Sequence, residues 1–197
     1  MKPPGTDLQW CRVALDAVAA VPWRNGGGVT RELLAWPSAH DWACRISVAE
    51  VAASGPFSAY PGVERWFAVL AGHGVTLDVA GQAHRLDTAS PPLRFAGDAS
   101  TTCTLLGGAT RDFNLMLRTG RAHGTLRRLQ GTLVHDVVQC VNTSKIIAIY
   151  SESTGADVFF DHETLRLPPQ TLGWAVVPRA GQLRVTSGAA LWLEVGA

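Results

Sequence analysis

Two stretches of the sequence place polar side chains on one face of an expected strand, where they could bind a small anion. In "ACRISVAEV" every second residue is apolar, and the alternate positions include Arg45 and Ser47. In "DFNLMLR" the apolar positions alternate with Asp112 and Asn114. Because successive side chains of a strand point to opposite faces, each stretch has one core-like face and one polar face. From composition alone these polar faces simply meet water, as in half-buried strands; a polar-lined cavity is the alternative.

Metal and nucleophile motifs are missing from the sequence. None of the six histidines occurs in HxH or HxxxH, the spacings that place two imidazoles on one face of a strand or helix. Neither GxSxG nor SxxK occurs. The cysteines, Cys11, Cys44, Cys103 and Cys140, form no CxxC pair, and we expect reduced, mostly buried thiols. Residues that are distant in sequence could still assemble a catalytic site in the folded protein.

Several histidines have a carboxylate neighbour, and we interpret these pairs as polar turns. They are His40-Asp41, His135-Asp136 and the "DHE" of residues 161–163. His73, between two glycines, is expected at a hairpin tip.

Composition excludes some classes of partner. The chain has 197 residues, 47% hydrophobic and 17% charged, and its 17 basic and 16 acidic side chains leave a net charge of +1 without long runs of one sign. Nucleic acid and anionic membrane are therefore not expected partners. No apolar run reaches 18 residues and the first residues lack a signal-peptide pattern, so we expect a cytoplasmic protein.

The chain is expected to be mostly β-strand. Its 20 glycines and 11 prolines separate short runs rich in Val, Leu, Thr and aromatic residues. Residues 8–21 fit either a helix or an opening strand. The expected strands are residues 29–36, 43–51, 65–70, 75–79, 82–86, 102–106, 113–118, 124–130, 137–141, 145–150, 156–160, 164–167, 174–177, 183–186 and 190–195.

So many strands exceed what one eight-stranded sandwich needs, which favours two stacked β-units. The phrases "FAVLAGHGVTLDVAGQAHRL" and "WAVVPRAGQLRVTSGAALWLEV" both read as strand, glycine turn, strand, glycine turn, strand. This weak likeness hints at an internal duplication.

The glycine run in "PWRNGGGVTREL" lacks the lysine of a phosphate-binding loop and leads into a β-branched residue. Three successive glycines cost conformational entropy, so a plain flexible turn explains them poorly. A close backbone approach or a positive φ angle explains them, and so does an ordinary β-bulge.

Four ordered motifs resemble the HutD/Ves family of bicupins. They are "PWRNGGGVTREL", "CRISVAEVAASGPFSAYPGVERWFAVLAGHGVTL", "LRFAGD" and "RDFNLMLRTG", and they cover most of residues 20–120. The resemblance implies an all-β bicupin, two cupin-like β-sandwich or barrel domains in one chain, which we place at residues 1–119 and 120–197. It also implies a link to histidine utilisation, which such proteins restrain or sense by binding a small intermediate.

Metal-dependent cupins carry HxH and a later carboxylate before a "YVLxG"-like strand. Here "FAVLAG" resembles that strand, and "GPFSAYPGVER" before it has no histidine. Glu64 is its only carboxylate, with the cation of Arg65 beside it. We therefore expect no metal and no other cofactor.

The resemblance favours a cavity-facing polar row, since both polar rows fall inside its motifs. An arginine in a cavity can hold a carboxylate through paired hydrogen bonds, with amide and hydroxyl groups on the remaining oxygens and acidic neighbours orienting the arginine. Glu64 and Arg65 could instead form a structural pair, and Trp23, Phe57 and Trp66 are expected as apolar walls or core. The candidate ligand-binding residues are Asn25, Glu32, Arg45, Ser47, Arg65, Asp112 and Asn114.

The sequence therefore predicts a metal-independent cupin that binds a small carboxylate metabolite of histidine degradation as a sensor or regulator. Formiminoglutamate, formylglutamate and urocanate are the candidate ligands. A cofactor-free isomerase or lyase acting on such a metabolite is the alternative, and an interaction module with a vestigial cavity is a third. Pairing through an exposed sheet edge makes a homodimer a further expectation.

Overall fold

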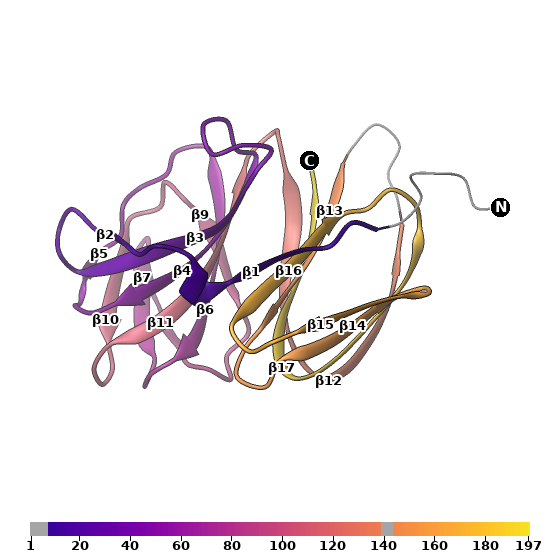
Figure 1. Cartoon of the computed structure of the whole chain (residues 1–197). Helices are drawn as coiled ribbons and strands as arrows, with labels where there is room; N and C mark the ends of the chain where they lie inside the picture. Colours follow the sequence, from indigo (N-terminus) through magenta and orange to yellow (C-terminus); the bar gives the residue numbers. More distant parts are fainter. Residues whose placement is uncertain (1–7, 139–143) are drawn as a thin grey trace. The chain divides into compact units, whose positions relative to one another are not determined.

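The computed structural model describes residues 8–138 and 144–197, which form two compact units (Figure 1). One unit is Val18–Ala122; the other combines residues 8–17 with residues 123–197. The expectations for Cys140, for the first six residues and for most of the strand at 137–141 lie outside the described residues. Within these residues the secondary structure is all-β apart from one short 3-10 helix, η1 (Leu15–Ala17).

The unit Val18–Ala122 contains a six-stranded and a four-stranded antiparallel sheet, ordered β2-β3-β4-β11-β6-β9 and β5-β10-β7-β8. Its core takes apolar side chains from both sheets, among them Phe67 and Phe95 from one and Leu77 and Cys103 from the other. The strands are β2 (Val21–Pro22), β3 (Gly28–Trp36), β4 (Cys44–Val51), β5 (Gly55–Pro56), β6 (Val63–Ala71), β7 (Val75–Val79), β8 (Gln82–Leu86), β9 (Leu93–Ala96), β10 (Thr101–Leu105) and β11 (Thr110–Arg118).

The second unit is one barrel-like antiparallel sheet, ordered β1-β16-β13-β17-β14-β15, with β12 also paired to β17. Its core contains Ile147, Ile149, Phe160 and Trp192, all 2% exposed or less. The strands are β1 (Cys11–Ala14), β12 (His123–Val137), β13 (Lys145–Ser151), β14 (Ala156–Phe160), β15 (Glu163–Leu167), β16 (Thr171–Val176) and β17 (Gly181–Gly196).

Strand register in the six-stranded sheet places the polar residues of three strands side by side. Met116 of β11 lies opposite Arg45 of β4 on one side and Arg65 of β6 on the other. In the next row of the same face, Asn114 lies between Ser47 and Phe67. Paired residues share a face, so the two arginines come from strands on either side of β11, with Cα atoms roughly 10 Å apart.

Most of the expected strands are confirmed within two or three residues, including those at 75–79, 82–86 and 156–160. Two expectations are wrong at the end of the chain, where residues 183–186 and 190–195 belong to the single strand β17. Gly188 lies within β17 and is not a turn. A Cβ there would lie 2.7 Å from the Thr154 hydroxyl, so the glycine permits a close contact with the connection between β13 and β14. The two repeated phrases therefore do not fold alike.

The N-terminal stretch that fitted a helix or a strand forms a strand. β1 pairs with β16 through residues 11–14, and the short helix η1 follows it. Three described cysteines are free: Cys44 and Cys103 are buried as expected, but Cys11 is exposed.

The glycine run contains both a positive φ angle and a close backbone approach. Gly26 has a φ of +71°, in the left-handed region that favours glycine. A Cβ on Gly28 would lie 2.3 Å from the carbonyl oxygen of Glu50 on the paired strand β4. The run thus closes the turn between β2 and β3 tightly against its neighbour.

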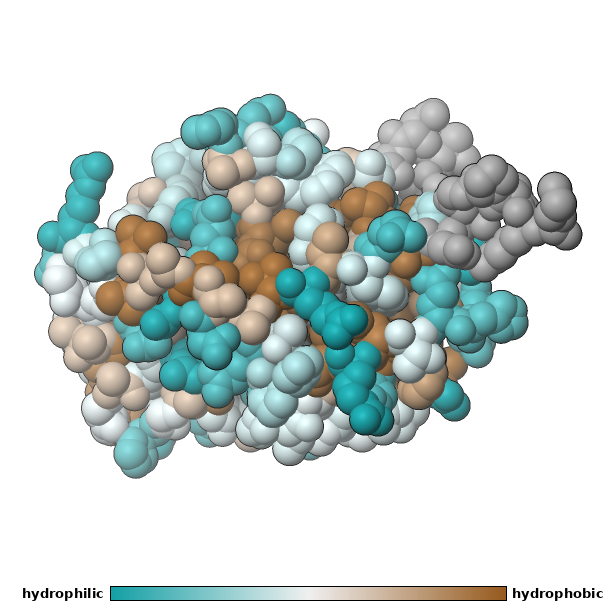
Figure 2. Space-filling view, viewed as in Figure 1, coloured by the Kyte–Doolittle hydropathy of each residue, from teal (hydrophilic) through white to brown (hydrophobic). Residues whose placement is uncertain are grey.

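The face of the molecule drawn in Figure 2 carries hydrophilic and hydrophobic residues interspersed. Within the described residues, none of the helical segments has the length and apolar character needed to cross a membrane.

Candidate functional site

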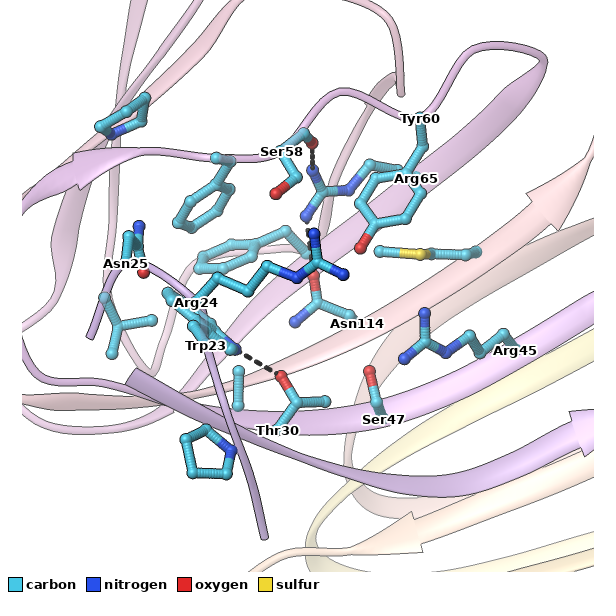
Figure 3. A pocket seen from close by; sticks show the side chains of 17 residues that line it. Trp23, Arg24, Asn25, Thr30, Arg45, Ser47, Ser58, Tyr60, Arg65 and Asn114 are labelled. Carbon is cyan, nitrogen blue, oxygen red and sulfur yellow. Dashed lines mark hydrogen bonds between the residues drawn. The ribbon is translucent and has the colours of Figure 1, made fainter. Parts of the chain in front are cut away.

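A cavity of about 410 Å³ opens in the unit Val18–Ala122 (Figure 3). The inner faces of β3, β4, β6 and β11 and the segments around residues 22–25 and 56–60 form its walls. The lining residues are Pro22, Trp23, Arg24, Asn25, Thr30, Arg45, Ser47, Ala49, Val51, Pro56, Phe57, Ser58, Tyr60, Arg65, Phe67, Asn114 and Met116.

Arg65 is the most buried of the charged residues that line the cavity, with 5% of its surface exposed. Its guanidinium donates one hydrogen bond to the backbone oxygen of Ser58 at 3.4 Å and one to Oδ1 of Asn114 at 3.3 Å. Both distances exceed the usual range for N–H···O bonds. The buried Nε has no hydrogen-bond partner in the described chain. A guanidinium has five N–H donors, so Arg65 retains donors for a ligand.

Aromatic rings rather than carboxylates surround the Arg65 cation. Its guanidinium carbon lies 5.3 Å from the ring centroid of Phe57, 5.5 Å from that of Tyr60 and 5.0 Å from that of Phe95. Such contacts stabilise a cation without neutralising it. The pKa of Arg65 is lowered to about 10, chiefly by burial; Tyr60 opposes this lowering and the nearby charge of Arg45 contributes to it. The group remains cationic at neutral pH.

Arg45 also lines the cavity, but a carboxylate already accompanies it. Its Nε lies 2.6 Å from Oε2 of Glu32, with side chains 23% and 39% exposed respectively. The Nε–H does not point at an acceptor, so the contact is an ion pair without an aligned hydrogen bond. Glu32 does not itself line the cavity. Glu32 is thus beside Arg45, as expected of an acidic neighbour, but is not on the cavity wall.

The remaining polar groups on the cavity wall are hydrogen-bonding amides and hydroxyls. Ser47 is 4% exposed and Asn114 6% exposed, and both face the cavity from neighbouring strands. The Asn114 oxygen accepts from Arg65, which leaves its amide N–H₂ free to donate. The polar faces of β4 and β11 therefore line a cavity rather than bulk water.

Asn25 reaches the cavity from the loop between β2 and β3. Its Oδ1 accepts a hydrogen bond from the backbone N–H of Gly27 at 3.1 Å, so the side chain shapes the turn. The Trp23 indole donates to the Thr30 hydroxyl at 2.7 Å and anchors the same loop to β3. The loop presents Arg24 to the cavity as well.

Asp112 does not line the cavity and does not contact an arginine, so its expected orienting role is wrong. It is fully buried one row deeper than Asn114, between Ala49 and Val69. The Thr110 hydroxyl donates to its Oδ2 at 2.8 Å, and its Oδ1 has no partner in the described chain. Burial raises the pKa of Asp112 to about 7, against the lowering effect of that hydrogen bond.

Glu64 and Arg65 do not form a structural pair, because neighbouring residues of β6 face opposite sides of the sheet. Glu64 instead accepts from Arg94 at 2.5 Å and from the Trp66 indole at 3.0 Å. Trp66 therefore lies away from the cavity, whereas Trp23 and Phe57 line it as expected.

The histidine pairs differ in their placement. His73 lies in the turn between β6 and β7, and Asp161 and His162 lie in the turn between β14 and β15, as expected. The expectation of a turn at His135 is wrong, because it lies within β12 and its Nε2 is 2.7 Å from Glu194 of β17. Lys145 of β13 also contacts Glu194, at 2.5 Å, so the three side chains form a polar cluster in the second unit.

Among the cavity-lining residues that were not sequence candidates, Arg24 and Tyr60 carry titratable side chains. Arg24 stands beside Asn25 in the glycine motif, and Tyr60 lies in "GPFSAYPGVER", between Phe57 and Arg65. Both occur in segments that resemble the family motifs, and that position was the available signal.

The donor set of the cavity does not suit a divalent cation. Three arginines line it, and none of the 17 lining residues is a histidine, cysteine, aspartate or glutamate. Across residues 8–138 and 144–197, no group of three or more such side chains could hold a metal ion.

Comparisons with known proteins place the chain among bacterial relatives. A sequence model of the family described as HutD matches residues 15–193. An uncharacterised 21.2 kDa protein in the hutC 3′ region of Pseudomonas putida is 38% identical over 114 residues, 57% of this chain and 60% of that protein. Protein Ves of Citrobacter koseri is 41% identical over 108 residues, 53% of this chain and 56% of that protein. The chain thus spans less than two thirds of the length of these relatives.

Solved structures share the fold. A conserved protein of unknown function from Pseudomonas aeruginosa PAO1 has a TM-score of 0.83 at 26% identity, over 95% of this chain and 97% of that chain. HutD from Pseudomonas fluorescens SBW25, in a formate condition, has a TM-score of 0.80 at 24% identity, over 95% and 98%. A cupin 2 conserved barrel domain protein from Leptotrichia buccalis has a TM-score of 0.52 at 9% identity, over 94% and 95%. The fold is therefore cupin-like.

Proposed function

From the premise that this chain belongs to the HutD family, we propose that its cavity binds a small carboxylate metabolite and that binding regulates histidine utilisation. The family has a link to the histidine-utilisation locus, since one relative lies in the hutC 3′ region. The two compact units then correspond to the two cupin-like domains of a bicupin, with the ligand held in the unit Val18–Ala122.

The observation that carries this proposal is the environment of Arg65. A buried cation is costly unless an anion or hydrogen-bond acceptors compensate it. Arg65 is 5% exposed, makes two long hydrogen bonds and has no carboxylate within 4 Å in the described chain. A carboxylate in the cavity would supply both the missing charge and a planar pair of acceptors.

Ser47 and Asn114 would complete the ligand site. A hydroxyl and an amide N–H₂ beside Arg65 can donate to carboxylate oxygens or bind a nitrogen-bearing substituent. Trp23 and Phe57, whose rings meet edge to face with centroids 6.2 Å apart, would pack against the carbon chain of the acid. Formiminoglutamate, formylglutamate and urocanate all combine these chemical features.

A cofactor-free enzyme acting on the same metabolite is the alternative. The titratable groups on the cavity wall are the arginines and Tyr60, which act as cations and hydrogen-bond donors. A general base with a pKa near 7 is the more usual requirement for isomerase or lyase chemistry, and this favours binding over turnover.

Thermal denaturation of the purified protein with each of the three acids tests the proposal. The wild type should gain roughly 5 to 10 °C in Tm at a ligand concentration near 100 times Kd. Arg65→Gln should abolish the gain, and Arg45→Ala should reduce it. Arg94→Gln is the matched control, because Arg94 is on β9, pairs with the outward-facing Glu64 and is 62% exposed.

The same mixtures, followed by proton NMR, separate the two functions. Stabilisation with an unchanged acid supports a binding protein, and a new product supports the enzyme. The absence of a Tm shift with all three acids would contradict the proposal.

Regulation is tested in cells. A chromosomal Arg65→Gln allele should alter the induction of the histidine-utilisation genes by histidine, whereas Arg94→Gln should not. Equal induction in both strains and in the wild type would contradict the regulatory role even if the purified protein binds an acid.

A further inference from the structure

The cavity carries more positive charge than one carboxylate can balance. Arg24, Arg45 and Arg65 line it, and no carboxylate does so among the described residues. Glu32, which does not line the cavity, offsets the charge of Arg45. The charges of Arg24 and Arg65 therefore remain uncompensated.

Arg24 is held at the cavity by the loop that carries it. The backbone N–H of Trp23 donates to the oxygen of Gly28 at 2.9 Å, and the N–H of Gly26 donates to the oxygen of Trp23 at 3.0 Å. The Trp23 indole bonds to Thr30 on β3. These contacts fix the backbone on both sides of Arg24, so the Cα atom of Arg24 has a defined position at the cavity wall.

The side chain of Arg24 extends into the cavity although it could point to solvent. Figure 3 shows it reaching from the loop across the space that Ser47, Asn114 and Tyr60 surround. The residue is exposed, and it has no ion pair or hydrogen bond within the described chain. Arg24 therefore offers a second cation, at the open side of the cavity, with all its donors available.

We propose that the cavity selects a small dianion, a dicarboxylic acid, with one carboxylate at Arg65 and the second at Arg24. This inference rests on the proposed carboxylate site and adds a second anionic subsite. Arg24 is then the residue that determines specificity, because it distinguishes a diacid from an acid whose second group is neutral.

The two subsites differ in how strongly dissolved salt should weaken their interaction with a carboxylate. Arg65 is buried, so its interaction with a carboxylate is little affected by salt. Arg24 is exposed, so its contribution is screened. The preference for a diacid should therefore shrink as ionic strength rises.

Matched acids test the proposal by isothermal titration. Malonate, succinate and glutarate are each compared with the corresponding monoamide, which has the same length and one fewer negative charge. At low salt, at least one diacid should bind about 10-fold more tightly than its monoamide. Arg24→Gln should remove this ratio by weakening the diacid alone, and Arg24→Lys should retain part of it. Arg65→Gln should weaken both members of the pair.

Each outcome bears on one of the two claims. Equal affinity of diacid and monoamide for the wild type, or an unchanged ratio in Arg24→Gln, would overturn the dianion subsite and leave the carboxylate site standing. If these acids and the three histidine-pathway candidates all fail to bind, the proposed function fails and the subsite fails with it.

Discussion

Arg65 is a cation that the fold buries without a carboxylate beside it. Because a buried charge without a counter-ion carries a desolvation cost, an apolar side chain of similar length can replace it with little loss of stability or a gain. We therefore expect Arg65→Met to keep the free energy of unfolding within about 1 kcal/mol of the wild type or to raise it, while removing the response to ligand.

Chemical denaturation without ligand, followed by titration with the acid, measures both effects. A loss of about 3 kcal/mol or more in Arg65→Met would mean that the arginine is primarily structural, held by Ser58, Asn114 and its three rings.

A second prediction at the residue scale concerns Asp112 and the pH dependence of the free energy of unfolding. Its pKa is raised to about 7 in the folded state, so the folded protein retains a proton that the unfolded chain releases near its ordinary value of 3.8. The stability that this proton provides is present at low pH and is lost as the pH rises towards 7, by on the order of 4 kcal/mol. Cys103, the titratable neighbour, has its pKa raised to about 12 by burial and by Asp112, outside this range.

Urea denaturation at several pH values between 4 and 8 checks this effect. Asp112→Asn keeps the shape of the side chain and removes its titration, so the fall in stability with rising pH should be smaller in the variant. Parallel pH profiles for the two proteins would contradict the account of Asp112.

Sequence reasoning located part of the site at this scale. Strand parity placed Arg45 and Ser47 on the polar face of one strand and Asn114 on that of another, the family resemblance favoured a cavity, and the structure places all three at the cavity. Parity did not distinguish Asn114 from Asp112, which shares its face but lies one row deeper. Ala49, opposite Asp112 in the same row, does line the cavity, so the residues of a face that reach the cavity depend on how other elements cover the sheet, and local sequence does not carry that information.

At the scale of elements, the turn from β2 to β3 is built around glycine. Gly28→Ala would place a Cβ 2.3 Å from the carbonyl oxygen of Glu50. Because this oxygen belongs to the backbone of β4, the clash can be relieved only by moving the strand. We expect it to cost on the order of 2 to 4 kcal/mol and to weaken ligand binding, since Arg24 and Asn25 depend on this turn.

Gly27→Ala is the matched control. Its added Cβ would meet only the Asn25 side chain, at 3.4 Å, an ordinary contact. Thermal denaturation and acid titration should show a far larger loss of stability and of affinity in Gly28→Ala than in Gly27→Ala. Similar losses in the two variants would show that flexibility of the run, rather than the close approach, is what the fold requires.

The two-residue period of apolar positions identified most strands, but Gly188 led to the prediction of two strands where the structure has the single strand β17. Gly188 was interpreted as a turn, whereas it permits a close contact with Thr154 inside a continuous strand. A glycine occurs in both settings, and only its contacts with residues distant in sequence distinguish them.

At the scale of the whole molecule, all the cavity-lining residues belong to the unit Val18–Ala122. Hydrogen exchange followed by mass spectrometry should therefore show ligand-induced protection in β4, β6, β11 and residues 23–30. Strands β13 and β17 of the other unit should change little. Equal protection in both units would contradict a ligand site confined to the first.

The composition of the units was only partly predictable. Residues 8–17 join the strands after residue 123 through pairing of β1 with β16, across more than 150 residues of sequence. Nothing in the local pattern of "WCRVAL" specifies so distant a partner. The all-β class was accessible from strand spacing and turn residues, because those signals are local.

The most direct test of the account is the structure of the protein in complex with the acid that binds it most tightly. We predict a carboxylate within hydrogen-bonding distance of the Arg65 guanidinium, with Ser47 or Asn114 donating to the same ligand. A bound acid held elsewhere on the protein, with the Arg65 guanidinium making no contact to it, would contradict the central claim.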